Sequence, residues 1–88
     1  MKLIGSFCLR TIADEIVAIP TGESVETFSG IISLNGVGRF LMELLAQECT
    51  EQSLTDRLQQ EYEVDGETAA ADVRDFLQIL RTNGLLRE

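Results

Sequence analysis

A short glycine motif is the first feature of this sequence that could serve chemistry. Gly36-Val37-Gly38 follows an expected strand and opens an expected helix, as the phosphate-binding loop of a dinucleotide site does. The third glycine of such a loop would fall at Leu41, and a second helix, rather than a parallel strand, is expected to follow. These departures favour an ordinary strand-to-helix turn over a nucleotide site.

Residues for catalysis and metal binding are scarce. The chain has no histidine, which excludes Ser-His-Asp and Cys-His catalysis and histidine-based metal sites. Cys8 and Cys49 lie far apart and form no Cys-x-x-Cys pair, so we interpret them as the reduced thiols of a cytoplasmic protein. The carboxylates fall on helix faces expected to be solvated. We therefore expect no enzymatic activity, no cofactor and no metal ion.

The charge balance limits the partners. The 88 residues include 15 Asp and Glu against 7 Lys and Arg, for a net charge of −8. Nucleic-acid binders neutralise phosphates with Lys and Arg, so we expect no nucleic-acid partner. No apolar run reaches the roughly eighteen residues of a membrane span. The N-terminus lacks a signal-peptide cleavage site, and we expect a cytoplasmic protein without membrane contact.

Extended segments are expected in the first third of the chain, which lacks helical periodicity. Residues 7–12 and 15–19 are β-prone and flank a plausible tight turn at Ala13-Asp14. Residues 26–34 alternate in polarity, as half-buried strands do. The two faces of this strand are Phe28, Ile32 and Leu34 on one side, and Thr27, Ser29, Ile31 and Ser33 on the other.

Three helices are expected to follow the strands. Asn35 is placed to cap the first, and Thr50 or Ser53 to cap the second. The third runs from about Thr68 to Asn83 and ends at Gly84. Their apolar stripes are, in order, Val37, Phe40, Leu41, Leu44 and Leu45; Leu54, Leu58 and Tyr62; and Ala69, Val73, Phe76, Leu77 and Leu80.

This order of elements predicts a single α+β domain over residues 1–88. Three N-terminal β-strands precede three α-helices, and the last four residues are expected to form a short extended tail. The arrangement is close to a winged helix-turn-helix. A domain of this length can fold alone, although with little stability to spare.

One predicted strand carries no charge over eight positions, from Thr27 to Leu34. Natural sheets protect exposed edge strands with Lys, Pro or bulges, because unpaired N–H and C=O groups attract other strands. The strand is therefore either central in the sheet or an edge reserved for a peptide, and the sequence leaves both interpretations open.

The third helix carries a second indication of a binding surface. Ile79 is apolar but lies off the centre of the buried stripe. It either widens the core contact or, with Phe76, lines a groove whose lip is Asp72, Asp75 and Asn83.

Several loose motifs occur in a fixed order along the chain. Gly30 to Gly38 reads G-x-I-x-L-N-x-x-G and is followed by Leu44-Leu45. Thr50 to Tyr62 reads T-x-x-x-L-x-x-x-L-x-x-x-Y, and Asp72 to Leu86 reads D-V-x-x-F-L-x-x-L-x-x-x-G-L-L. With the opening segment from Phe7 to Pro20, the chain resembles over nearly its whole length the PqqD-like proteins, peptide-recognition elements of ribosomal peptide natural-product biosynthesis.

The resemblance implies three strands, three helices and a non-catalytic adaptor. Such an adaptor binds the leader segment of a precursor peptide and presents it to a modifying enzyme, often a radical S-adenosylmethionine enzyme. The leader adds as an extra strand to the third strand and lies against the third helix. Carried over to this chain, the peptide-binding residues are Thr27, Phe28, Ser29, Gly30, Ile31, Ile32, Asp72, Asp75, Phe76, Ile79 and Asn83.

The resemblance also suggests separate roles for these residues. Phe28 would support the sheet from the core side, while Ile31, Phe76 and Ile79 would line the pocket. Asp72 and Asp75 would select a leader with a nearby Lys or Arg.

Two other classes of function stay open at this point. A winged-helix transcription regulator would need a basic recognition helix, but acidic residues flank the second helix and the third is no richer in Lys or Arg. A self-pairing dimerisation module would use the same uncharged strand edge, and light scattering would distinguish it from a monomeric adaptor.

Overall fold

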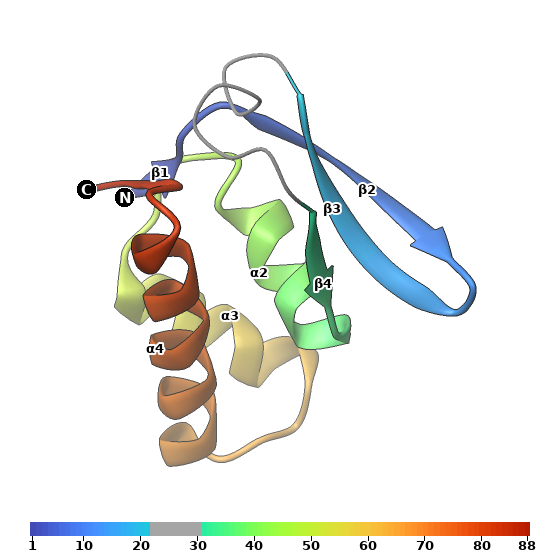
Figure 1. Cartoon of the computed structure of the whole chain (residues 1–88). Coiled ribbons are helices and arrows are strands. Elements are labelled where there is room, and N and C mark those ends of the chain that lie inside the picture. Colours follow the sequence, from blue (N-terminus) through green and yellow to red (C-terminus); the bar gives the residue numbers. More distant parts are fainter. Residues whose placement is uncertain (22–30) are drawn as a thin grey trace.

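The chain folds as a small antiparallel sheet followed by helices. The computed structural model describes residues 1–21 and 31–88. Their elements, in order, are β1 (Lys2–Leu3), β2 (Ser6–Ile12), β3 (Glu15–Thr21), β4 (Ile32–Leu34), α2 (Gly36–Leu44), α3 (Glu51–Glu61), α4 (Gly66–Thr82) and β5 (Leu86–Arg87). Figure 1 shows the sheet on one side of the three labelled helices, which confirms the predicted α+β, winged-helix-like class.

The main sheet has the order β2-β3-β4, so β2 and β4 are its two edges among the described residues. Ala13 and Asp14 have φ angles of 51° and 68° and form the tight turn predicted between β2 and β3. Figure 1 shows this turn projecting past the helices. Ala18 pairs with Leu9 on one side and Ile32 on the other, and it belongs to the core cluster formed by the helix leucines, which identifies the face that packs on the helices.

Side-chain caps begin all three described helices. The Asn35 Oδ1 accepts a hydrogen bond from the Gly38 N–H at 2.7 Å, as predicted. Thr50 and Ser53 form a reciprocal capping box at the start of α3. The third helix begins at Gly66, two residues before the expected Thr68, because the Asp65 carboxylate accepts from the Thr68 N–H at 2.7 Å.

The core lies between the helices and the inner face of the sheet. Its fully buried large side chains are Leu41, Leu45, Leu54, Leu58, Val73, Leu77, Leu80 and Leu85. Met42 is buried as well, although the predicted stripe omitted it. Tyr62 was expected in the stripe of the second helix but is 37% exposed. Its ring packs edge-on against Phe40, and its hydroxyl donates to the Gly36 carbonyl at 3.2 Å.

A second, two-stranded sheet joins the ends of the described chain. The predicted C-terminal extension is confirmed as β5, which pairs with β1. β1 was not predicted from the sequence, because two residues are too few to show any periodicity. Backbone bonds from the Leu3 N–H to the Leu45 carbonyl and from the Cys49 N–H to the Met1 carbonyl hold this sheet against the helices.

Candidate functional site

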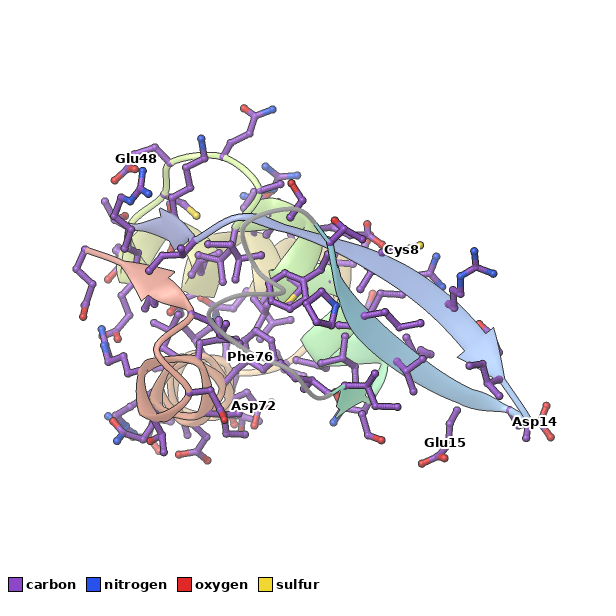
Figure 2. The ribbon with its side chains drawn as sticks, turned by 45° about the horizontal axis from the view of Figure 1, so that its top comes forward. Cys8, Asp14, Glu15, Glu48, Asp72 and Phe76 are labelled. Carbon is purple, nitrogen blue, oxygen red and sulfur yellow. The ribbon has the colours of Figure 1, made fainter. Side chains whose placement is uncertain are left out.

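A groove lies between the start of α2 and the middle of α4. Its volume is about 270 Å³, and its lining residues are Asn35, Val37, Gly38, Asp72, Asp75, Phe76 and Ile79. Figure 2 shows Asp72 and Phe76 on the side of α4 that faces the sheet. Asn35 directly follows β4, so the edge strand leads into the groove.

The helical repeat explains the α4 wall. Positions 72, 75, 76 and 79 are spaced by three and four residues, which places them on one face of a helix. Phe76 is only 8% exposed and forms the floor, whereas Ile79 is 49% exposed and forms the rim.

The opposite wall depends on the glycine at position 38. A Cβ atom there would lie 3.4 Å from the Phe76 ring and 3.3 Å from both the Leu34 side chain and the Asn35 Oδ1. The absence of a side chain therefore lets the aromatic ring pack close to the first turn of α2.

The structure brings together four of the residues predicted from the sequence, namely Asp72, Asp75, Phe76 and Ile79. Ile32 lies in β4, half-buried and paired with Ala18 on the inner face. Ile31 precedes β4 and is 58% exposed. Thr27, Phe28, Ser29 and Gly30 lie outside the described residues.

Asn83 has a different position from the one expected. It follows the last residue of α4, and its side-chain amide donates to the Ile79 carbonyl at 2.8 Å. It does not line the groove. The predicted lip therefore consists of Asp72 and Asp75, while Asn83 satisfies a carbonyl at the end of the helix.

Sequence reasoning did not assign Asn35, Val37 and Gly38 to the groove. It interpreted them as a helix cap, a core residue and a turn. These local interpretations agree with the structure, but the contact of this segment with α4 spans more than thirty positions of the chain. No local pattern reports such a contact.

The groove carries negative charge. Asp72 is half-buried and Asp75 is exposed, and none of the lining residues that the structure describes is a Lys or Arg. Two carboxylates without a lining cation give a potential that attracts positive groups.

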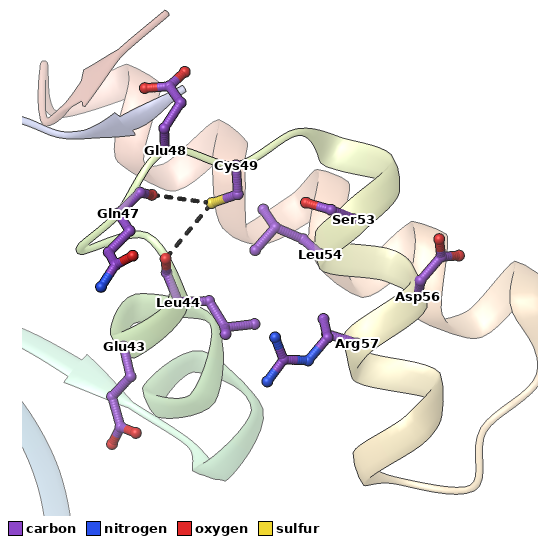
Figure 3. Close-up of a pocket in the computed structure, with 9 residues that line it drawn as sticks. All are labelled: Glu43, Leu44, Gln47, Glu48, Cys49, Ser53, Leu54, Asp56 and Arg57. Carbon is purple, nitrogen blue, oxygen red and sulfur yellow. Dashed lines mark hydrogen bonds between the residues drawn. The ribbon is translucent and has the colours of Figure 1, made fainter.

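A larger cavity lies between the end of α2 and the first turns of α3 (Figure 3). Its volume is about 560 Å³, and it contains the thiol of Cys49. The sulfur lies 3.4 Å from the Gln47 carbonyl and 3.6 Å from the Leu44 carbonyl, to which it donates. Burial raises the pKa of the Cys49 thiol. Nucleophilic cysteines need the opposite shift, so the Cys49 thiol does not have the lowered pKa of an activated nucleophile.

Within residues 1–21 and 31–88, no three or more His, Cys, Asp or Glu side chains gather to hold a metal ion. None of the helices in these ranges combines the length and the apolar character needed to cross a bilayer.

Solved structures and a family model extend these observations. TbiB1 in complex with the TbiA(beta) leader peptide is 29% identical, with a TM-score of 0.73 over 99% of this chain and 95% of that chain. Lasso peptide synthetase B1 complexed with the leader peptide shares the fold at 20% identity, with a TM-score of 0.69 over 99% of this chain and 96% of that one. A comparison with curated protein sequences found no match.

The family model covers most of the fold that builds the groove. The model for coenzyme PQQ synthesis protein D (PqqD) matches residues 15–86, which run from the start of β3 into β5. The matched region contains both walls of the groove and the edge strand beside it. The chain therefore belongs to the PqqD family.

Proposed function

We propose that this protein is a non-catalytic adaptor for a ribosomally made precursor peptide. It binds the leader segment by strand addition and presents the peptide to a modifying enzyme in the cytoplasm, where the precursor is made. The observation that carries the proposal is an edge strand, β4, that leads directly into an acidic groove along α4. The similarity to TbiB1, solved with the TbiA(beta) leader peptide, supports it.

The groove suits one side chain of an extended peptide. At about 270 Å³ it is smaller than the sites that enclose drug-sized molecules, which measure about 300–1,000 Å³. Main-chain hydrogen bonds to the sheet edge would set the register, each with a net contribution of about 0.5–1.5 kcal/mol. One apolar anchor, fully buried against Phe76, would contribute about 1.5–3 kcal/mol before the cost of ordering the peptide.

Charge would select among leaders. Asp72 and Asp75 border the groove, so a Lys or Arg next to the apolar anchor would be favoured. In this proposal residues 27–31 extend the pairing edge beyond β4, as the family resemblance implies.

A role as a transcription regulator is not favoured. The net charge is −8, and two of the seven cations are already paired. Arg39 bonds Glu43 at 3.0 Å, and Arg81 bonds Glu88 at 2.8 Å. Few cations remain to contact phosphates, which supply most of the affinity of a DNA-binding protein.

A two-dimensional amide NMR titration would test the proposal. The labelled protein would be titrated with the leader peptide encoded beside it. Strand addition with a side chain in the groove predicts shift changes confined to residues 27–38 and 72–79. A titration to high peptide concentration without changes in these residues, or with changes only elsewhere, would contradict the proposal.

A further inference from the structure

We propose a second strand-addition site on the opposite edge of the sheet, where β2 borders another groove. Its occupant is an extended segment of the modifying enzyme, with alternating apolar residues and with carboxylates. This inference rests on the proposed function, because it supplies the contact through which an adaptor would meet the enzyme.

The second groove lies between β2 and α2 and measures about 510 Å³. Ser6, Phe7 and Leu9 contribute to one wall, and Met42 and Ala46 to the other. β2 is an edge strand, and no described residue pairs with its outer side. As at β4, a strand edge that none of the described residues covers therefore lies beside a groove formed with a helix.

The strand register places apolar side chains at this groove. Leu9 pairs with the buried Ala18, so Leu9 and Phe7 lie on the inner face of the sheet, where both are only half-buried. A strand added to β2 would direct every second side chain toward the same face. Those side chains would cover Phe7 and Leu9 and complete their burial.

The charges identify the occupant. Lys2 lines the groove and Arg10 is the one charged residue of β2, and neither has an ion pair within the described residues. Among the described residues that line this groove, the single carboxylate is that of Glu43, which is already paired with Arg39 at 3.0 Å. This half of the edge therefore favours acidic segments, whereas the groove at α4 favours basic ones.

Other occupants fit these charges less well. The acidic residues Asp14 and Glu15 lie at the far end of the hairpin, beyond Arg10, and so lie outside the half of the β2 edge that borders the groove. A second copy of the chain, paired through β2, would bring two Arg10 side chains and two net charges of −8 together. A basic leader would meet Lys2 and Arg10.

The two sites are far enough apart to be filled together and close enough to cooperate. With neighbouring strands about 4.8 Å apart, guests on the outer sides of β2 and β4 would lie roughly 19 Å from each other. About six extended residues span that distance. An enzyme bound at β2 would thus lie within reach of the peptide that continues from the leader.

An NMR titration with two synthetic peptides tests this site. One peptide alternates valine and glutamate, and the other alternates valine and lysine at equal length. The proposal predicts that the glutamate peptide shifts residues 6–12, Met42 and Ala46, with no change at residues 72–79. The lysine peptide should leave residues 6–12 unchanged.

A pair of variants locates the effect. Ala46→Phe fills the groove at an exposed position and should abolish the shifts at residues 6–12. Gln47→Phe is the matched control, because Gln47 is also exposed but lines the cavity on the other side of α2, and it should retain them. An amide spectrum of each free variant checks the fold.

Three results would overturn the second site. The first is no shift at residues 6–12 with the glutamate peptide, and the second is equal shifts at these residues with both peptides. The third is a dimer seen by light scattering in the wild type but not in Ala46→Phe, which would mean that β2 pairs with a second copy of the chain. The leader titration is read at residues 27–38 and 72–79 and fails independently. If the leader shifts residues 27–38 and 72–79 but the glutamate peptide does not shift residues 6–12, only the second site is rejected. If the glutamate peptide shifts residues 6–12 but the leader leaves its own residues unchanged, the proposed function is rejected.

Discussion

The residues of the α4 groove divide into those that set its shape and those that set its charge. Phe76 forms a buried floor, and Gly38 leaves room for the ring. Asp72 and Asp75 supply the negative border. Affinity for the leader should therefore respond separately to a change of space and to a change of charge.

Reversal of one border charge tests the electrostatic role. Asp75→Lys should weaken binding of a basic leader about fivefold at low salt, because an attractive pair at an exposed position becomes a repulsive one. The loss should shrink at high salt, where screening is strong. Isothermal titration calorimetry at two salt concentrations measures both. Asp56→Lys makes the same charge change on α3, outside the groove, and should change affinity little. Unchanged affinity and salt dependence for Asp75→Lys would show that this role is wrong.

A single methyl group tests the shape of the groove. Gly38→Ala places a Cβ 3.3–3.4 Å from Leu34, Asn35 and Phe76, so the ring must move outward by a few tenths of an ångström. Alanine favours the helix by about 1 kcal/mol, which offsets part of the crowding. We expect a small change in the free energy of unfolding and a clear loss of leader affinity. Urea denaturation and calorimetry check the two quantities, and unchanged affinity would contradict the assigned shape.

At the scale of elements, the caps decide where each helix begins and so where its groove residues lie. Asp65 begins α4 and Asn35 begins α2, and these two helices provide the two walls. The hydrogen bond from the Thr68 N–H is the main reason that the pKa of Asp65 lies below its ordinary value. A lowered pKa in the folded state links the start of α4 to pH.

Acid should weaken this helix start. Because the folded state lowers the pKa of Asp65, the ionised cap stabilises the fold above the ordinary pKa of about 3.9. This contribution is lost as the pH falls through the lowered value. Asp65→Asn keeps an acceptor without the charge, so wild type should be the more stable near neutral pH and the difference should vanish in acid. Urea denaturation over a pH series measures it.

A second acid-sensitive group serves as the control for that series. Glu88 also has a lowered pKa, caused chiefly by the hydrogen bonds from Arg81. Glu88→Gln should remove its own share of the acid sensitivity and leave the share of Asp65 intact. A constant gap between wild type and Asp65→Asn at all pH values would contradict the linkage.

At the scale of the whole molecule, stability and binding reside on different sides of α4. Leu77 is fully buried among the leucines of the core, whereas Ile79 is 49% exposed at the rim of the groove. A substitution at Leu77 should therefore change the stability of the fold, and a substitution at Ile79, two positions further along α4, should change leader binding.

Truncation of these two residues should give opposite results. Leu77→Ala should lower the free energy of unfolding by about 2–5 kcal/mol, a large part of the roughly 5–15 kcal/mol of a small domain. Ile79→Ala should change stability by less than about 1 kcal/mol yet reduce leader affinity. Urea denaturation and leader titration of both variants measure the difference. Equal losses of stability would mean that Ile79 belongs to the core.

Much of the fold was predictable because its causes are local. The apolar repeat of the three helices, the caps at Asn35 and Thr50 and the turn at Ala13-Asp14 depend only on neighbouring residues. One wall of the groove followed from the helical repeat as well, because Asp72, Asp75, Phe76 and Ile79 share a face in any helix.

Tertiary structure decided what these faces meet. The start of α2 forms the second wall of the α4 groove, and Tyr62 packs against Phe40 instead of in the core. The two residues of β1 form a strand because they pair with β5. The groove at β2 likewise required the distance between a strand and a helix that are separate in the chain. Periodicity and capping are properties of neighbouring residues and can be read from the sequence. A groove is a space left between distant elements, and its walls are set only when those elements pack together.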